Sequence, residues 1–409
     1  MSSESFEMVS AGDIGVFRGG SGFPVRFQGL KSGELPFFKV SDMNRQGNEL
    51  FMVKANNYVS EEVRASLGAT RIPAGAIVFA KVGAAVYLER KRVLAQDSCI
   101  DNNMAAFIVD QSSFDVRFLH YLLSAFKLSS LVATTALPSL NGVQLRSIPL
   151  LMPSTVTEQR EIASILSNVD MMIASIERLI EKKRSVKRGM VQELLSGTSR
   201  LPGFDAPWTP TVIASLGSLL KGRGVKRDDV RAAGVPCIRY GELYTTFSDY
   251  TDTTVSFVDA DVASTALPIA EGDLLFAGSG ETKADIGTCV AYVGRSPAVA
   301  GGDIIVLRAP SINPVFLASL LNTPQISAMK ARSGQGDAVV HISARAIGEL
   351  KVELPERPEQ DAIARLIVDA DRDLAAQGTL LEVVRNIKQG MMQELLTGRT
   401  RLNRQEAAA

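Results

Sequence analysis

The stretch GMVQELLSGTSRL, residues 189–201, is written a second time as GMMQELLTGRTRL, residues 390–402. The repeat extends upstream without a gap, since residues 158–201 and 359–402 are identical at 19 of 44 positions. Weaker matches precede each copy, among them PAGAIVFA against AEGDLLFA and RFLHYLLS against VFLASLLN. Self-similarity at a fixed offset indicates a repeated architecture, here two tandem halves, each a variable domain of about 150 residues followed by a well-matched segment of about 45.

The matched segments have the periodicity of long helices, because apolar residues recur every three or four positions in a heptad seam. Thr155 with Glu158 fits a capping box, Pro358 fits a first helical turn, and Gly197 and Gly398 fit the C′ position. The helix predicted from Glu158 to Leu195 would be about 57 Å long at ~1.5 Å per residue. The predicted seam follows Ile162, Ile165, Val169, Met172, Ile176, Leu179, Lys183, Val186 and Met190, and then Ile363, Leu366, Ala370, Asp373, Gln377, Leu380, Val384, Ile387 and Met391.

An amphipathic helix of this length needs a partner. Heptads in general more often join separate chains, but here both copies lie on one chain with a globular domain between them. We therefore predict an antiparallel intramolecular pair, in which Lys183, Asp373 and Gln377 fix the register or else face solvent or another subunit. Gly189 and Gly390 each cost about 1 kcal/mol relative to alanine, which indicates close approach of a partner or a tolerated weak point.

Each variable domain mixes short strands with one or two helices, which predicts an α+β fold. PFFKV, AIVFAKV, AAVYL and AAFIV have strand patterns in the first half, and VPCIRY, DLLFAG, TCVAYVG and DIIVLR have them in the second. FDVRFLHYLLSAF and NPVFLASLLN have helical patterns. The fold class predicted from these patterns is a pseudo-twofold tandem repeat, in which two long antiparallel coiled-coil helices separate two globular domains of mixed α/β composition.

Composition excludes several classes of protein. No apolar run is long enough to span a membrane, and the acidic start MSSESFEMVS lacks the features of a secretory signal. Three isolated cysteines indicate neither a disulfide framework nor a zinc site, so we expect a cytoplasmic protein. The 44 basic residues balance the 44 acidic ones, which argues against a globally basic nucleic-acid binder but leaves room for local basic faces.

Basic and amide side chains nevertheless collect at the predicted turns of both variable domains. Such side chains bond phosphates and read base edges. A single one is more often a solvated surface group, so the clusters ERKR and KGRGVKR carry more weight than their members. The candidate DNA-binding residues are Arg18, Lys39, Lys81, Arg90, Lys91, Arg92, Asn102, Asn103 and Asn141 in the first domain, and Lys221, Arg223, Lys226, Arg227, Arg239, Lys283, Arg332, Gln335 and His341 in the second.

The segments ELPFFKVSDMN, PAGAIVFAKVGAAVYLERKRVLAQDSCIDNN, GSGETKADIGTCVAYVG and GQGDAVVHIS, with the paired helix ends, resemble the DNA specificity subunit of Type I restriction-modification systems. The resemblance covers essentially the whole chain in the family's order. It implies target recognition domain 1 over residues 1–153, a central spacer helix over 154–201, target recognition domain 2 over 202–355, a distal spacer helix over 356–402, and a tail over 403–409.

The resemblance also implies a non-catalytic chain that reads a bipartite, asymmetric target in double-stranded DNA. Two methyltransferase (modification) subunits would dock on the helices, and two restriction (translocase-nuclease) subunits can join them. Adenine methylation and cleavage would then take place in those partners. The cofactors S-adenosylmethionine, ATP and Mg²⁺ would belong to the partners, with none in this chain. No membrane partner is implied, and the bases that are read do not follow from the sequence.

Two alternatives remain open from the residues themselves. FAGSG (276–280) matches the loop by which amino-methyltransferases hold S-adenosylmethionine, and NPVF (313–316) approaches their catalytic tetrapeptide. Val315 replaces the expected proline, however, and the first half carries neither pattern. The second alternative, a coiled-coil adaptor that does not bind DNA, would leave the basic turns unexplained. GETKAD (280–285) is a solvated or DNA-facing turn, or a metal-dependent nuclease cluster. His120 is expected on a helix face, without a metal-ligand pattern.

Overall fold

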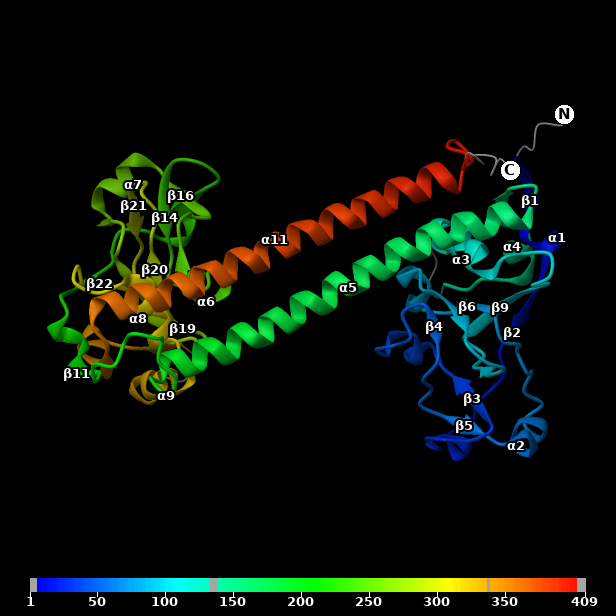
Figure 1. Ribbon diagram of the computed structural model, residues 1–409, viewed down its shortest axis with the longest axis horizontal. Coiled ribbons are helices and arrows are strands. Elements are labelled where there is room, and N and C mark those ends of the chain that lie inside the picture. Colours follow the sequence, from blue (N-terminus) through cyan, green and yellow to red (C-terminus); the bar gives the residue numbers. More distant parts are fainter. Residues whose placement is uncertain (1–5, 133–137, 337–338, 403–409) are drawn as a thin grey trace. The chain divides into compact units, whose positions relative to one another are not determined.

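The computed structural model describes residues 6–132, 138–336 and 339–402, so the predicted tail over 403–409 lies outside the described residues. The chain divides into two compact units, one formed by residues 1–177 and 379–409 and the other by residues 178–378. Both boundaries fall inside long helices, α5 (Val156–Leu195) and α11 (Arg357–Leu395) (Figure 1). Each unit therefore contains one variable domain and half of each long helix.

The two long helices run antiparallel within the first unit. Asp170 of α5 pairs with Lys388 of α11 at 2.6 Å, and Glu177 pairs with Arg385 at 2.6 Å. Residue numbers rise along one helix as they fall along the other. The predicted antiparallel pairing within one chain is therefore confirmed.

The second unit repeats this arrangement with the helix halves exchanged. Lys187 pairs with Asp371, which is the Asp170–Lys388 pair shifted by 201 residues. Lys183 pairs with Asp373, so these two polar seam residues contact each other. The pseudo-twofold repeat predicted from the sequence thus extends to individual ion pairs.

The seam prediction was wrong at three of the four intermediate positions of each helix, whereas Ile165 and Asp373 are half-buried. Met172, Leu179 and Val186 are 50%, 40% and 61% exposed, whereas Ile180, one residue beyond Leu179, is 7% exposed. The observed stripe of α5 keeps every second predicted position, at intervals of seven residues from Ile162. Between these positions, the stripe uses the residue that directly follows the predicted one. On α11 the same shift leaves Leu366, Leu380 and Ile387 exposed. Apolar residues occupy both candidate positions in most turns, so packing against the partner helix selects the stripe.

The ends of the long helices carry the strongest repeated contacts. Arg401 makes a bidentate pair with Glu158 at 2.9 and 2.8 Å, and Arg200 makes the equivalent pair with Glu359 at 2.7 and 2.7 Å. Glu158 therefore completes only half of the predicted capping box: its backbone N–H donates to Thr155 Oγ1 at 3.2 Å, while its carboxylate binds arginine. Paired arginine and carboxylate geometry of this kind fixes orientation as well as adding energy.

Glycines at the helix ends and interiors behave differently. Gly197 and Gly398 have φ of +69° and +67°, which confirms the predicted left-handed C′ positions. At Gly189 and Gly390, a Cβ atom would meet nothing within 4 Å among the described residues. Close approach within this chain therefore does not explain these two glycines.

The variable domain of the first unit is built on a five-stranded sheet in the order β2-β9-β6-β7-β4, with a smaller sheet β5-β3-β8 and the pair β1-β10. All pairings are antiparallel except β4 with β7 and β3 with β8. Helix α3 covers the larger sheet and also contacts α5 (Figure 1). The elements are β1 (Glu7–Ser10), α1 (Ala11–Ile14), β2 (Gly15–Gly19), β3 (Leu35–Phe38), β4 (Phe51–Met52), β5 (Tyr58–Val59), α2 (Glu61–Ser66), β6 (Ile77–Ala80), β7 (Lys91–Leu94), β8 (Cys99–Ile100), β9 (Met104–Val109), α3 (Val116–Ala125), α4 (Gly142–Arg146) and β10 (Pro149–Met152).

The second unit repeats the larger sheet as β12-β22-β18-β20-β15, beside the sheet β13-β16-β14-β21-β17 and the pairs β11-β24 and β19-β23. Its elements are β11 (Thr209–Val212), β12 (Ser218–Lys221), β13 (Val230–Arg231), β14 (Val235–Ile238), α6 (Glu242–Thr245), β15 (Tyr250–Thr251), β16 (Ser256–Val258), α7 (Ala260–Thr265), β17 (Leu267–Ile269), β18 (Leu274–Ala277), β19 (Ser279–Gly280), β20 (Cys289–Tyr292), β21 (Ala298–Ala300), β22 (Ile304–Arg308), α8 (Pro314–Leu321), α9 (Pro324–Ser333), β23 (Val340–His341), α10 (Ala344–Gly348) and β24 (Lys351–Leu354).

One predicted strand is absent: AAVYL forms a 3-10 helix, η3 (Ala84–Leu88). Gly83 at φ +80° turns the chain out of the sheet, and Glu89 at φ +52° ends the turn. The Glu89 carboxylate accepts the backbone N–H groups of Leu128 and Ser129 at 3.0 and 2.7 Å. These tertiary hydrogen bonds outweigh the strand propensity of a five-residue segment.

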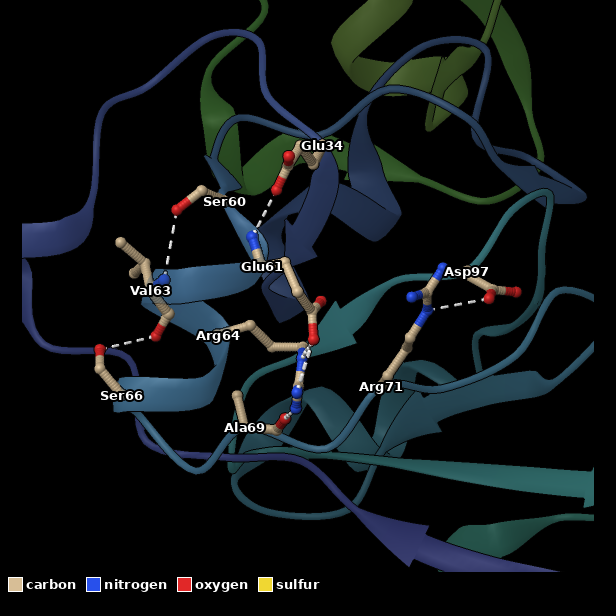
Figure 2. A network of polar contacts seen from close by, with 9 residues as sticks. All are labelled: Glu34, Ser60, Glu61, Val63, Arg64, Ser66, Ala69, Arg71 and Asp97. Carbon is tan, nitrogen blue, oxygen red and sulfur yellow. Dashed lines mark hydrogen bonds and ion pairs between the residues drawn. The ribbon is translucent and has the colours of Figure 1, made fainter.

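Helix α2 shows how the smaller sheet of the first unit is bordered by local polar contacts (Figure 2). Ser60 caps the helix through Val63 N–H at 3.2 Å, and Glu61 pairs with Arg64 at 2.7 Å. Arg71 pairs with Asp97 at 3.0 Å between the following loops (Figure 2). These charges are engaged with each other at the surface, so they serve the local structure.

Candidate nucleic-acid interface

Two adjoining hollows on the second unit gather most of its candidate DNA-binding residues. Hollow A has a volume of about 530 Å³ and hollow B about 480 Å³. Asp303 lines both, so they share a rim. Of the predicted residues, Lys226, Arg227 and Arg239 line hollow A, and Lys221, Gln335 and His341 line hollow B.

Arg239 is held in place at the wall of hollow A. Its Nε donates to Glu242 Oε1 at 2.8 Å, and its backbone N–H donates to Glu242 Oε2 at 3.0 Å. Glu242 is 4% exposed and also accepts the Ser256 hydroxyl. The guanidinium is thus oriented by a buried carboxylate while its side chain remains 39% exposed. An oriented, partly exposed arginine is suited to a phosphate or a guanine edge.

Sequence reasoning missed two aromatic residues of hollow A. Tyr240 and Tyr244 both line it, with ring centroids 6.5 Å apart. Burial raises the pKa of the Tyr244 hydroxyl, so it stays a neutral hydrogen-bond donor. The interleaving of tyrosine with Arg239 in RYGELY was the available signal, since aromatic and basic side chains together are typical of nucleic-acid surfaces.

The wall of hollow B carries a matched pair of polar side chains. Gln335 and His341 exchange backbone hydrogen bonds at 2.9 and 2.8 Å and are both exposed. The His341 Nδ1 lies 2.7 Å from the hydroxyl of Ser279, which is 1% exposed. This hydrogen bond holds the imidazole of His341 in place at the wall of hollow B.

The other three candidates of the second unit lie outside the lining of the two hollows. Arg223 donates to the Thr265 carbonyl at 3.1 Å, whereas Lys283 and Arg332 are exposed near the rims. Lys283 is next to Thr282, whose backbone and hydroxyl are both bonded to Asp285 Oδ2. GETKAD is therefore a hydrogen-bonded turn. Among the described residues, no cluster of three or more His, Cys, Asp or Glu could hold a metal ion.

In the first unit, one group of candidates meets where β2 and β6 end and β9 begins. The Lys81 ammonium lies 2.8 Å from the place of a Cβ on Gly19, beside Arg18. The Lys81 backbone bonds the Asn103 carbonyl and the Leu140 N–H at 2.8 and 2.9 Å. Asn102 and Asn103 are exposed beside it, and Asn141 caps α4 through its own side chain.

Each unit places one lysine at the equivalent point of its five-stranded sheet, but the lysine comes from a different segment in each unit. In the repeat alignment Gly19 corresponds to Lys221 and Lys81 corresponds to Gly278. In the first unit the lysine is Lys81, which directly follows β6, and its ammonium lies beside Gly19, the last residue of β2. In the second unit Lys221 stands opposite Gly278, and both line hollow B. The two units therefore share this backbone arrangement, which we call the frame, while the lysine and the glycine have exchanged positions.

Two further candidates of the first unit are engaged in local contacts. Lys39 donates to Gln28 Oε1 at 3.2 Å, and its backbone N–H donates to Asp42 at 2.8 Å, the counterpart of the Arg239–Glu242 turn. Arg90 donates to the Asn44 side chain. Lys39 and Arg90 remain half-buried, so each can still present part of its charge at the surface.

The two remaining members of the ERKR cluster point inward. Lys91 is 2% exposed, pairs with Glu89 and donates to the Phe126 carbonyl at 3.0 Å, and burial lowers its pKa. Arg92 is half-buried, and burial also lowers its pKa. His120 lies on α3 as expected, with its Nε2 3.0 Å from the Lys91 carbonyl, and burial lowers the pKa of its imidazole to about 4. Lys91 therefore cannot reach DNA without leaving its ion pair.

The motif that approaches a methyltransferase tetrapeptide is a helix cap. Asn313 Oδ1 accepts Phe316 N–H at 3.0 Å, and Asn313 Nδ2 donates to Asp361 at 2.7 Å. Asp115 caps α3 in the first unit through Phe118 N–H at 3.0 Å. Because the first unit makes the same cap with an aspartate, NPVF is accounted for by helix initiation.

Comparisons with known proteins agree on one family. Residues 3–183 match the sequence model described as Type I restriction modification DNA specificity domain. The Type I restriction enzyme MjaVIII specificity subunit of Methanocaldococcus jannaschii is 22% identical over 329 residues, which are 76% of each chain. The putative MjaX specificity subunit of the same organism is 23% identical over 327 residues, covering 73% of this chain and 72% of that one.

Solved structures share the fold along almost the whole chain. The S subunit of a Type I restriction-modification system from M. genitalium has a TM-score of 0.57 at 15% identity, covering 97% of both chains. The HsdS subunit from Thermoanaerobacter tengcongensis has a TM-score of 0.53 at 15% identity, covering 97% of this chain and 98% of that one. None of the helices in the described ranges is long and apolar enough to cross a membrane.

Proposed function

We propose that this chain, which belongs to the family of Type I restriction-modification specificity subunits, reads an asymmetric, bipartite DNA target for partner subunits that modify and cleave DNA. The observation that carries the proposal is the repeated frame with exchanged readers. Lys81 opposite Gly19 and Lys221 opposite Gly278 stand at equivalent points of two sheets of the same topology. Two similar frames with different side chains are suited to two half-sites of different sequence.

The contact types in the hollows fit duplex DNA. Lys221, Lys226 and Arg227 are exposed cations that can neutralise phosphates without sequence preference. Arg239 and Gln335 carry the two functional groups that bond guanine and adenine edges in pairs. The chain's own part is therefore binding and positioning, and the chemistry belongs to other subunits.

Repeated apolar residues on the helices support two equivalent docking positions. Leu179 and Leu380 are 40% and 41% exposed, and Val186 and Ile387 are 61% and 52% exposed. Each pair is related by the 201-residue offset, so each unit offers one copy. Exposed apolar residues grouped on a helix mark interaction surfaces. Two identical modification subunits would bind these surfaces, with S-adenosylmethionine held by them, and two restriction subunits with ATP and Mg²⁺ would join the assembly.

Mapping methylated adenines by single-molecule sequencing, in cells with and without this gene, tests the proposal. The expected result is one split motif that is methylated only when the gene is present. Exchanging residues 202–355 for those of another specificity subunit should change one half of the motif and leave the other half unchanged. Unchanged methylation after deletion of the gene would refute the proposed function.

A further inference from the structure

A negatively charged side chain stands at the rim that hollows A and B share. Asp303 lines both hollows, is exposed, and directly precedes β22. The cations Lys226, Arg227 and Arg239 line hollow A, and Lys221 lines hollow B. A carboxylate among them repels the phosphates that these cations attract. An aspartate at this place therefore needs a reason other than phosphate binding.

The backbone of Asp303 is in the left-handed region, with a φ of +60°. L-residues rarely adopt this region, and aspartate does so mainly where its side chain hydrogen-bonds the backbone. Glu89, the other such residue in the described ranges, uses its carboxylate to hold the backbone at Leu128 and Ser129. No hydrogen bond or ion pair of the Asp303 carboxylate is recorded among the described residues. The Asp303 side chain is therefore available to bind a ligand.

The internal repeat identifies Asn103 as the counterpart of Asp303. The Gly278 N–H donates to the Asp303 carbonyl at 2.7 Å, and the Lys81 N–H donates to the Asn103 carbonyl at 2.8 Å. The strands that follow, β22 and β9, pair with β18 and β6 in the same register. Asn103 is also exposed. Asp303 and Asn103 therefore occupy one position of the frame, beside the exchanged lysine and glycine.

A carboxylate has a specific use at the edge of a base pair. In the major groove cytosine presents only an amino group, whereas adenine presents an amino group beside the N7 acceptor. A carboxylate accepts a hydrogen bond from the cytosine amino group, but at adenine it would also face the lone pair of N7. An amide can accept from the adenine amino group and donate to N7 at the same time. Lysine and arginine, which only donate, cannot bond the cytosine amino group.

Two other carboxylates line hollow A, and both differ from Asp303. Glu242 is buried and already binds Arg239 and the Ser256 hydroxyl. Glu281 is exposed but does not line hollow B, where the lysine and glycine of the frame lie. Asp303 is thus the carboxylate that belongs to the frame, and Glu281 offers a control with the same charge in the same surroundings.

We propose that Asp303 selects cytosine at one position of the half-site that the second unit reads, by accepting a hydrogen bond from the cytosine amino group. This inference rests on the proposed function, because it assigns one base contact within that DNA-reading surface. The surrounding cations hold the phosphates, and the carboxylate distinguishes the bases. In the first unit the amide of Asn103 stands at the equivalent position, so the shared frame presents a different reader to the other half-site.

Selection of duplexes from a randomised library by the full chain tests this contact. The wild type should select a split motif with cytosine preferred by about 5- to 150-fold at one position of one half-site. Asp303→Asn should change that preference from cytosine to adenine, and Asp303→Gly should remove it, with every other position of the motif unchanged. Asparagine and glycine both tolerate a left-handed backbone, so both variants should keep the urea midpoint of the wild type.

A matched variant and a modified base separate a direct contact from an effect of charge. Glu281→Gln removes the same charge from hollow A and should keep the cytosine preference. Both Glu281→Gln and Asp303→Asn should bind unrelated DNA at least as tightly as the wild type, because each loses a group that repels phosphates. Replacing the selected cytosine by an analogue that lacks only the 4-amino group should weaken the wild type about five- to tenfold more than Asp303→Gly, as expected for a direct pair.

Several results would overturn the inference while the proposed function stands. They are an Asp303→Gly variant that selects the wild-type motif, a loss of affinity that is equal for all sequences, an equal penalty for the modified base in both proteins, and a Glu281→Gln variant that loses the same cytosine preference. If the wild type selected no split motif at all, the proposed function and this inference would both be refuted.

Discussion

Replacing Lys221, Lys226 and Arg227 together by alanine should change the salt dependence of DNA binding in a calculable way. All three are exposed and line hollows A and B. If each neutralises one phosphate, the slope of log affinity against log salt becomes shallower by about 2.7, at ~0.9 per contact. The variant should then bind roughly 3,000-fold more weakly at about 50 mM salt but only about 80-fold more weakly at about 200 mM.

Fluorescence anisotropy with a duplex containing the methylated motif measures both quantities across the salt series. Arg372→Ala, a charge removal on α11 away from the hollows, should leave the slope unchanged. Circular dichroism of the triple variant checks that the fold is retained. A variant that lost affinity by the same factor at every salt concentration would refute the reasoning, because its cations would then act through something other than phosphate contacts.

Four other outcomes follow from particular contacts. His341→Ala should relax base preference at one position of one half-site in a binding selection, at a cost of about 1–3 kcal/mol; a uniform loss over all sequences would contradict a base contact. Glu242→Gln removes the carboxylate that orients Arg239, and the free energy of unfolding in urea should fall by about 2 kcal/mol; an unchanged midpoint would contradict this. Burial lowers the pKa of Lys330 to about 8. At pH values between about 8 and the ordinary 10.5, Lys330 is protonated in the unfolded chain and neutral in the folded one. The free energy of unfolding should therefore rise by about 1 kcal/mol from about pH 7 to 9, relative to the Lys330→Met variant. A fall over this range would contradict the lowered pKa. Inserting four residues into each long helix adds about 6 Å and should lengthen the gap between half-sites by under 2 base pairs without changing their bases; an unchanged gap would contradict the spacer role.

The long helices illustrate the limit of periodicity as a predictor. Their existence, ends and pairing followed from heptads, Gly197 and Gly398, and a repeat within one chain. The facing residues did not, since the residues three and four positions beyond Ile162 are both apolar. Because an α-helix has 3.6 residues per turn, a buried stripe can continue at either the third or the fourth residue. In the folded chain Ile180 is buried and Leu179 is exposed.

The candidate site was predictable as a class of side chains but not as a surface. Six of the nine candidates in the second unit line two adjoining hollows, yet nothing in ERKR distinguishes the fully buried Lys91 from its half-buried neighbours Arg90 and Arg92. Its burial depends on Glu89, which adopts a left-handed conformation and also binds the backbone at Leu128. Tyr240 and Tyr244 were missed because the other walls of their shared hollow, among them Lys226, Ser256 and Asp303, come from segments distant in the sequence.

The sequence by itself determined the tandem repeat, the two long helices and the presence of basic, amide-rich turns, because these are local patterns written along the chain. Tertiary structure alone decided which cations reach the surface and which apolar stripe is buried. The physical reason is that burial and ion pairing depend on residues up to 243 positions away, and no local pattern records which of them will meet.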